Sequence, residues 1–69
     1  MEKLTPRELE VVKLLVTGST LKQIAGALEV SEQTVKNYST SLRRKLGATT
    51  LAHAVFKFVS EYDFEVSTA

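Results

Sequence analysis

The sequence lacks cysteine and tryptophan, and its 69 residues include only one histidine, one proline and three glycines. Without cysteine the chain can form neither a disulfide framework nor a thiolate metal site. The single histidine, His53, excludes a histidine cluster that would hold a metal ion. No apolar run approaches the roughly 18 residues that a membrane-spanning helix needs. We therefore expect one small soluble domain that is not an enzyme, with no catalytic residues, cofactor or metal.

Charged residues make up 25% of the chain, and their distribution is more informative than the net charge of +1. Residues 31–47 carry a net charge of +3, because four lysines and arginines stand against Glu32 alone. Residues 48–69 carry −2, because Lys57 stands against three carboxylates. A short basic segment is often only a solvated helix face. Its place in the fold must decide whether it indicates a nucleic-acid surface.

Capping motifs predict where the first two helices begin. Thr5 is followed by a proline at the first helical position and by Glu8 three residues after the cap, which forms a capping box. A second capping box, Thr-Leu-Lys-Gln, begins at Thr20. Apolar residues at intervals of three or four extend the first helix to Gly18 and give a short second helix of about residues 21–28.

Two further helices are predicted after a short turn. Ser31 can cap a third helix, of about residues 31–46, which Gly47 can end. A fourth helix opens at residue 49 or 50 and continues to Tyr62. No alternation typical of strands persists anywhere.

The predicted fold is all-α: a four-helix bundle-like domain over residues 1–62, followed by a tail of residues 63–69. The second and third helices are separated by about three residues, which is the length of a helix-turn-helix connection. In such a motif the second helix of the pair enters the major groove of DNA. The third predicted helix is therefore the segment that decides the function.

The outward side of this third helix has no acidic residue and no large apolar residue. It comprises Gln33, Asn37, Thr40 and Arg44, flanked by Thr34, Lys36, Ser41 and Arg43. Amides, hydroxyls, lysine and arginine bond base edges and phosphates, and a major groove about 12 Å wide admits one such helix. The pattern therefore favours binding to double-stranded DNA over a merely solvated face.

Three stretches of the sequence resemble the DNA-binding domain of the LuxR/FixJ family, also called the GerE-like domain. They are LTPRELEVVKLL, GSTLKQIAGALEVSEQTVKN and LRRKLGATT, within roughly residues 4–60. The resemblance implies a cytoplasmic bacterial transcription regulator whose third helix lies in the major groove and whose fourth helix forms dimers. Family members usually carry a preceding regulatory domain, such as the receiver of a response regulator. Such a domain, outside this sequence, is therefore a further candidate partner. RNA polymerase is another candidate partner.

The resemblance also implies contacts position by position. Base contacts fall at Lys36, Asn37 and Thr40, and phosphate contacts at Thr20, Lys22, Thr34 and Tyr38. With the outward side of the third helix added, the predicted base-contacting set is Gln33, Lys36, Asn37, Thr40 and Arg44, and the phosphate-contacting set is Thr20, Lys22, Thr34, Tyr38, Ser41 and Arg43. The chain departs from the family at Tyr38, where histidine is common. It also has Gly26-Ala27 where basic residues are frequent, which we expect to weaken non-specific affinity.

The predicted fourth helix carries more apolar surface than one core needs. Its apolar residues span an arc of about 200°, whereas packing on a single core typically uses a stripe nearer 100°. Scattered apolar side chains on a surface are also normal. We interpret the surplus as a weak homodimer interface, which would place two third helices on a two-fold related site. The predicted interface residues are Leu51, Ala52, Val55, Phe56 and Val59.

Two other functions fit parts of the sequence. A sigma-factor-like promoter-binding module would share the Leu-Thr-Pro-Arg-Glu opening, although Thr-Val-Lys-Asn-Tyr in the third helix fits the LuxR type better. A protein-interaction adaptor would use the apolar fourth helix and bind no DNA. The acid-free face of the third helix favours DNA binding over the adaptor, and salt-sensitive retention on DNA would distinguish the two.

Overall fold

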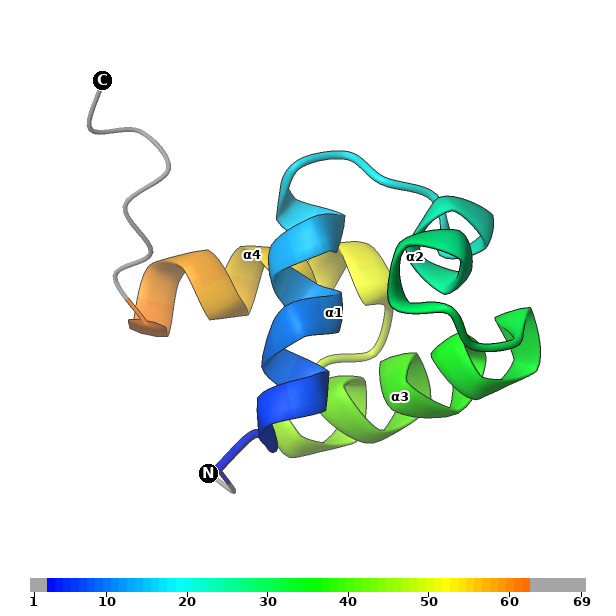
Figure 1. The fold of residues 1–69 in the computed structure, drawn as a ribbon. Helices are drawn as coiled ribbons and strands as arrows, with labels where there is room; N and C mark the ends of the chain where they lie inside the picture. Colours follow the sequence, from blue (N-terminus) through cyan, green and yellow to red (C-terminus); the bar gives the residue numbers. More distant parts are fainter. Residues whose placement is uncertain (1–2, 63–69) are drawn as a thin grey trace.

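The computed structural model describes residues 3–62 and consists of four helices joined by short turns (Figure 1). These are α1 (Pro6–Val16), α2 (Leu21–Leu28), α3 (Glu32–Lys45) and α4 (Leu51–Tyr62). No strand occurs within the described residues, and the predicted all-α fold is confirmed. In the same range, no helix combines the length and the apolar character needed to cross a membrane. The predicted tail, residues 63–69, lies outside the described residues.

The helix α3 is the element on which the other three converge. It packs against α1, α2 and α4, while α1 also packs against α2 and α4. Within the described residues the backbones of α2 and α4 do not come close to each other. In Figure 1 α3 runs along one edge of the molecule, with α2 beside its N-terminal half. One long side of α3 therefore stays uncovered.

The two predicted capping boxes begin α1 and α2. The Thr5 hydroxyl accepts a hydrogen bond from Glu8 N at 3.2 Å, and Glu8 Oε1 accepts one from Thr5 N at 2.8 Å. Thr20 and Gln23 form the same reciprocal pair at the start of α2. Each pair supplies partners for backbone N–H groups that have none inside the helix.

Hydroxyl caps also begin the other two helices. Ser31 Oγ accepts from Thr34 N at 3.0 Å at the start of α3. Thr50 Oγ1 accepts from His53 N at 3.0 Å, so Thr50 rather than Thr49 opens α4. These local bonds explain why the helix starts follow closely from the sequence.

Residues with a left-handed backbone follow α1, α2 and α3. Gly18 (φ 95°) and Gly47 (φ 69°) end α1 and α3 as predicted, because glycine adopts positive φ at little cost. The residue that ends α2 is Glu29, whose φ of 59° is uncommon for a side chain with a Cβ atom. The turn at Glu29 is what directs the chain from α2 into α3.

The core is small and almost wholly aliphatic. Phe58 is its one aromatic member among the described residues, and Val11, Val12, Val35 and Leu42 are fully buried beside it. Ser39 and Glu8 are the two polar residues of the described range that are also buried.

Candidate nucleic-acid interface

The outer face of α3 carries all five residues predicted to contact bases. Their side chains are exposed and recur at helical spacing along one side of the helix. They are Gln33, Lys36, Asn37, Thr40 and Arg44. The apolar residues Val35 and Leu42 are buried on the other side of α3. The structure therefore brings the five residues together on one polar surface.

Two of these side chains are already oriented by a bond to each other. Gln33 Nε2 donates to Asn37 Oδ1 at 3.1 Å, across one turn of α3. The bond leaves the Asn37 amide nitrogen as a donor and the Gln33 amide oxygen as an acceptor. An amide pair held in this way presents a donor and an acceptor together. This pattern is complementary to the adenine edge in the major groove, where N7 accepts and N6 donates.

The six residues predicted to contact phosphates are divided between α2 and α3. Thr20 and Lys22 are exposed at the start of α2, where the partial positive charge of the helix end attracts anions. The other four, Thr34, Tyr38, Ser41 and Arg43, are half-buried along α3. The Thr20 hydroxyl caps α2, and the Thr34 hydroxyl lies 2.9 Å from Ser31 Oγ. These two hydroxyls therefore also serve the local fold.

Ser41 faces α1 rather than the outer face of α3. Its hydroxyl donates to Glu8 Oε2 at 2.5 Å, and Lys45 Nζ donates to Glu8 Oε1 at 2.9 Å. Glu8 Oε1 also accepts the capping bond from Thr5 N. This buried cluster ties the start of α1 to the C-terminal half of α3. The hydroxyl proton of Ser41 is thus already donated within the protein.

The environment of Glu8 keeps its carboxylate charged. Burial acts to raise the pKa of Glu8, but the hydrogen bonds from Ser41, Thr5 N and Lys45 and the charge of Lys45 outweigh it. The pKa is lowered from 4.5 to about 2. A carboxylate that accepts several hydrogen bonds is stabilised in its charged form, so the cluster is an ion pair at neutral pH.

Two residues of this site are not evident as site residues from the sequence. No local pattern links Lys45 to Glu8, which lies 37 residues earlier. The only sequence signal for Ser39 is its spacing, four residues after Val35 and three before Leu42. That spacing places Ser39 on the buried side of α3, and the structure shows it to be 7% exposed.

Positive charge on this side of the molecule is not balanced by neighbouring acids. Among residues 3–62, Lys36, Arg43 and Arg44 on α3 form no ion pair, and Lys22 on α2 forms none either. Unpaired cations around a polar helix face raise the local potential and attract polyanions. The net charge of +1 therefore understates how basic this surface is.

The five predicted interface residues of the fourth helix do not share one environment. Leu51 is half-buried and packs on the core. Phe56 is 68% exposed and Val59 is 38% exposed, while Ala52 is exposed and Val55 half-buried. Ala52, Val55, Phe56 and Val59 recur at helical spacing, and we call them the α4 apolar surface. Leu51 lies outside it because its side chain contributes to the core.

The described residues offer nothing that would hold a metal ion. No group of three or more histidine, cysteine, aspartate or glutamate side chains with suitable placement occurs among them. His53 is exposed on α4, away from the outer face of α3.

Comparison of the sequence with known proteins finds related bacterial regulators. Residues 2–58 match the bacterial regulatory proteins of the luxR family. The spore germination protein GerE of Bacillus subtilis is 40% identical over 63 residues, which make up 91% of this chain and 85% of that protein. The nitrate/nitrite response regulator NarP of Escherichia coli is 43% identical over 58 residues, 84% of this chain but 27% of NarP.

A solved structure shares the fold. A chain in the crystal structure of the Vibrio cholera VqmA–ligand–DNA complex is similar to this one with a TM-score of 0.81 and 36% sequence identity. The likeness covers 86% of this chain and 26% of the VqmA chain. The matched region is thus most of the four-helix domain, and it forms about a quarter of that larger protein.

Proposed function

Since this chain belongs to the luxR family of bacterial regulatory proteins and is a helix-turn-helix DNA-binding domain, not an enzyme, we propose that α3 is its recognition helix. In this proposal α3 lies in the major groove of double-stranded DNA. The observation that carries it is the acid-free outer face of α3, with five exposed side chains whose polar groups can all bond base edges. The surrounding cations have no acidic partners in the described range, which supports an anionic ligand.

The five side chains divide by the base edges that they fit. The amides of Gln33 and Asn37 suit adenine, whose N6 and N7 form a donor and an acceptor. Lys36 and Arg44 suit guanine, which presents two acceptors, O6 and N7. Thr40 can bond a base edge through its hydroxyl or contact a thymine methyl group. We expect this division to be reflected in the sequence of the preferred site.

Phosphate contacts fix the register of the domain on the duplex. We propose that Lys22 and the N-terminus of α2 bind one strand, with Thr20, Thr34, Tyr38 and Arg43 contributing along the same edge. Ser41 is the weakest member of the predicted set, because its hydroxyl proton is donated to Glu8. Two-fold pairing through α4, a separate regulatory domain and contact with RNA polymerase stay predictions.

Replacing Asn37 by alanine tests the placement of α3. We expect the variant to bind a selected duplex about 5- to 150-fold more weakly, since one good base contact contributes about 1–3 kcal/mol. The measurement is the dissociation constant on a duplex selected from a random pool, with circular dichroism to confirm folding. Lys13→Ala, which truncates an exposed side chain of α1, is the matched control and should bind like the parent. Equal affinity of Asn37→Ala and the parent would contradict the placement.

The salt dependence of binding separates this function from a protein-interaction adaptor. Each phosphate neutralised by the protein releases condensed counterions, so log K should fall against log salt with a slope of about −0.9 per contact. Lys22 and Arg43 are two such candidates. We therefore expect a steep slope for the parent and a slope shallower by about one for Lys22→Gln. If the log K of the parent does not change with salt, the result would favour a protein-interaction adaptor.

A further inference from the structure

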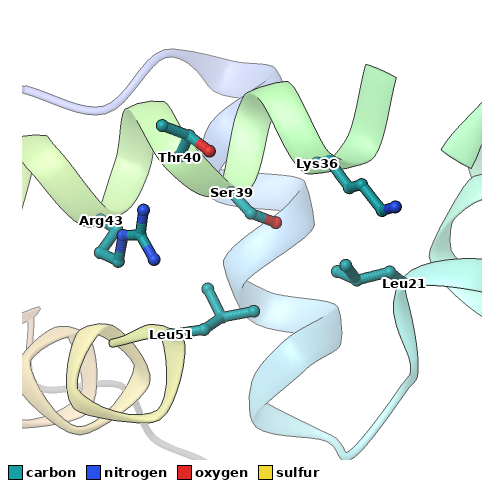
Figure 2. Close-up of a pocket in the computed structure, with 6 residues that line it drawn as sticks. All are labelled: Leu21, Lys36, Ser39, Thr40, Arg43 and Leu51. Atoms are coloured by element: carbon teal, nitrogen blue, oxygen red, sulfur yellow. The ribbon is translucent and has the colours of Figure 1, made fainter. Parts of the chain in front are cut away.

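A groove opens beside the outer face of α3, in the space where α2 and α4 do not meet. Its volume is about 300 Å³. Figure 2 shows α3 along one side, with Leu21 and Leu51 opposite and α1 behind. Leu21 and Leu51 are the first residues of α2 and α4. The lining residues are Leu21, Lys36, Ser39, Thr40, Arg43 and Leu51.

The floor of this groove holds a hydroxyl that no described residue bonds. Ser39 is 7% exposed, and its Oγ has no hydrogen-bond partner in the described part of the chain. Figure 2 shows this hydroxyl directed into the space between Leu21 and Leu51. Native proteins seldom leave a buried polar side chain unpaired, and such a group calls for an explanation. A ligand oxygen entering the groove would provide the missing partner.

Every electrostatic feature of the groove favours an anion. Lys36 and Arg43 stand at its two ends in Figure 2, and neither has an acidic partner within residues 3–62. The N-termini of α2 and α4 both border it. Thr20 and Thr50 each accept a hydrogen bond from one first-turn N–H group, and the others have no partner inside the helix. Among the described residues, no acidic side chain lines the groove.

We propose that this groove is a phosphate site, in which Ser39 donates a hydrogen bond and Arg43 neutralises the charge, with Lys36 at the opposite end adding to the positive potential. Leu21 and Leu51 fit the carbon atoms of an attached sugar. On the basis of the proposed function, the phosphate comes from the DNA strand that passes beside α3, since Lys36 and Thr40 belong both to the groove and to the outer face. A free phosphate ion is the alternative source of the same chemistry.

The first arm of the test uses inorganic phosphate and the whole chain. Backbone amide NMR is followed during titration with phosphate, with chloride exchanged to keep ionic strength constant. Saturable shifts around residues 21, 39 and 51 that disappear in Ser39→Ala would show that free phosphate binds. Ser60→Ala, which removes an exposed hydroxyl of α4, is the control and should titrate like the parent.

The second arm uses selected duplexes in which a single phosphate is replaced by an uncharged methylphosphonate. For the parent, we expect one replacement per half-site to weaken binding by about tenfold or more, since a hydrogen bond to a charged group is lost. The same replacement should have little further effect in Ser39→Ala or Arg43→Gln. Lys13→Gln loses the same charge on α1 and should respond like the parent.

The outcomes separate this inference from the proposed function. If Ser39→Ala loses the response to free phosphate or to the methylphosphonate, the result supports the site. The arm in which the response is lost identifies the source of the phosphate. If the parent binds its selected duplex but Ser39→Ala matches it in both arms, the phosphate site is wrong and the proposed function stands. If the parent binds no duplex, the proposed function fails, and the first arm alone decides the groove. Ser39→Ala should melt no lower than the parent, because the hydroxyl has no hydrogen-bond partner among residues 3–62.

Discussion

Replacing Glu8 by glutamine is expected to lower the free energy of unfolding at neutral pH by about 3 kcal/mol. A shift of the Glu8 pKa from 4.5 to about 2 corresponds to a stabilisation of this order. Its side chain is only 5% exposed, so solvent screens the interaction little. Glutamine preserves the size of the side chain and can keep the capping bond to Thr5 N. The loss would therefore come from the contacts with Ser41 and Lys45, which would leave the half-buried Lys45 without a counter-charge.

The pH dependence of unfolding tests the cause of this loss. Because the folded pKa of Glu8 lies below the unfolded value, its contribution is present above about pH 4.5 and disappears as the pH falls toward 2. The difference between the parent and Glu8→Gln should therefore narrow across that window. Urea denaturation at several pH values measures it. Glu10→Gln, with the same charge change at an exposed residue of α1, should shift stability by less than about 0.5 kcal/mol.

A difference that stays constant from pH 7 to pH 2 would contradict the ionic origin of the loss. The cost would then reflect altered packing around residue 8. Whether the loss is ionic or arises from packing matters for function, because the cluster of Glu8, Ser41 and Lys45 ties α1 to α3. If it is ionic, Glu8→Gln should also bind DNA more weakly in conditions where the protein is still folded.

The local features of this fold could be predicted because their causes are local. A capping box needs two residues three apart, and Thr5 with Glu8 satisfies that condition within one turn of chain. The helix ends at Gly18 and Gly47 depend on one residue type that adopts positive φ. The exposed face of α3 follows from helical period alone. None of these requires knowledge of which helix packs on which.

The features that were missed depend on distant parts of the chain. Glu8 satisfies a local cap and also an ion pair with Lys45, and only the packing of α1 on α3 brings that pair together. Spacing indicates that Ser39 is buried, but it cannot show that a groove stays open beside it. That groove exists because α2 and α4 do not meet, which is a tertiary property.

The apolar surface of the fourth helix could be predicted from the sequence only in part. The width of its apolar arc indicated that one core would not cover all of it, and the exposure of Phe56 and Val59 agrees with that surplus. The helical period alone could not say which part of the arc faces the core. Packing decides it: Leu51 belongs to the core side, so a substitution there would disturb the fold as well as any interface.

Replacing Phe56 by glutamate is expected to abolish cooperative binding to a duplex with two half-sites while sparing binding to one half-site. The α4 apolar surface is the proposed contact between two copies, and Phe56, at 68% exposed, is its largest side chain. Burying this ring would contribute strongly to association, whereas a carboxylate at the same place would have to be desolvated without a partner. Because Phe56 is exposed, the substitution should leave the core intact.

The surface is small, because each copy offers little more than one helix face. Interfaces that bury less than about 1,200 Å² in total are typically weak and transient. We therefore expect the free domain to be largely monomeric at micromolar concentration and to pair on DNA. Two α3 helices would then occupy successive turns of the major groove, with half-sites about 10 base pairs apart.

Gel-shift titrations on duplexes with one and with two half-sites measure the cooperativity directly. His53→Glu introduces the same charge on α4 outside the apolar surface, at an exposed position, and should remain cooperative. Circular dichroism confirms that both variants are folded. If folded Phe56→Glu keeps the cooperativity of the parent, α4 does not pair two copies. The exposed apolar side chains would then be better explained as a surface for a regulatory domain, because relatives such as NarP are much longer than this chain.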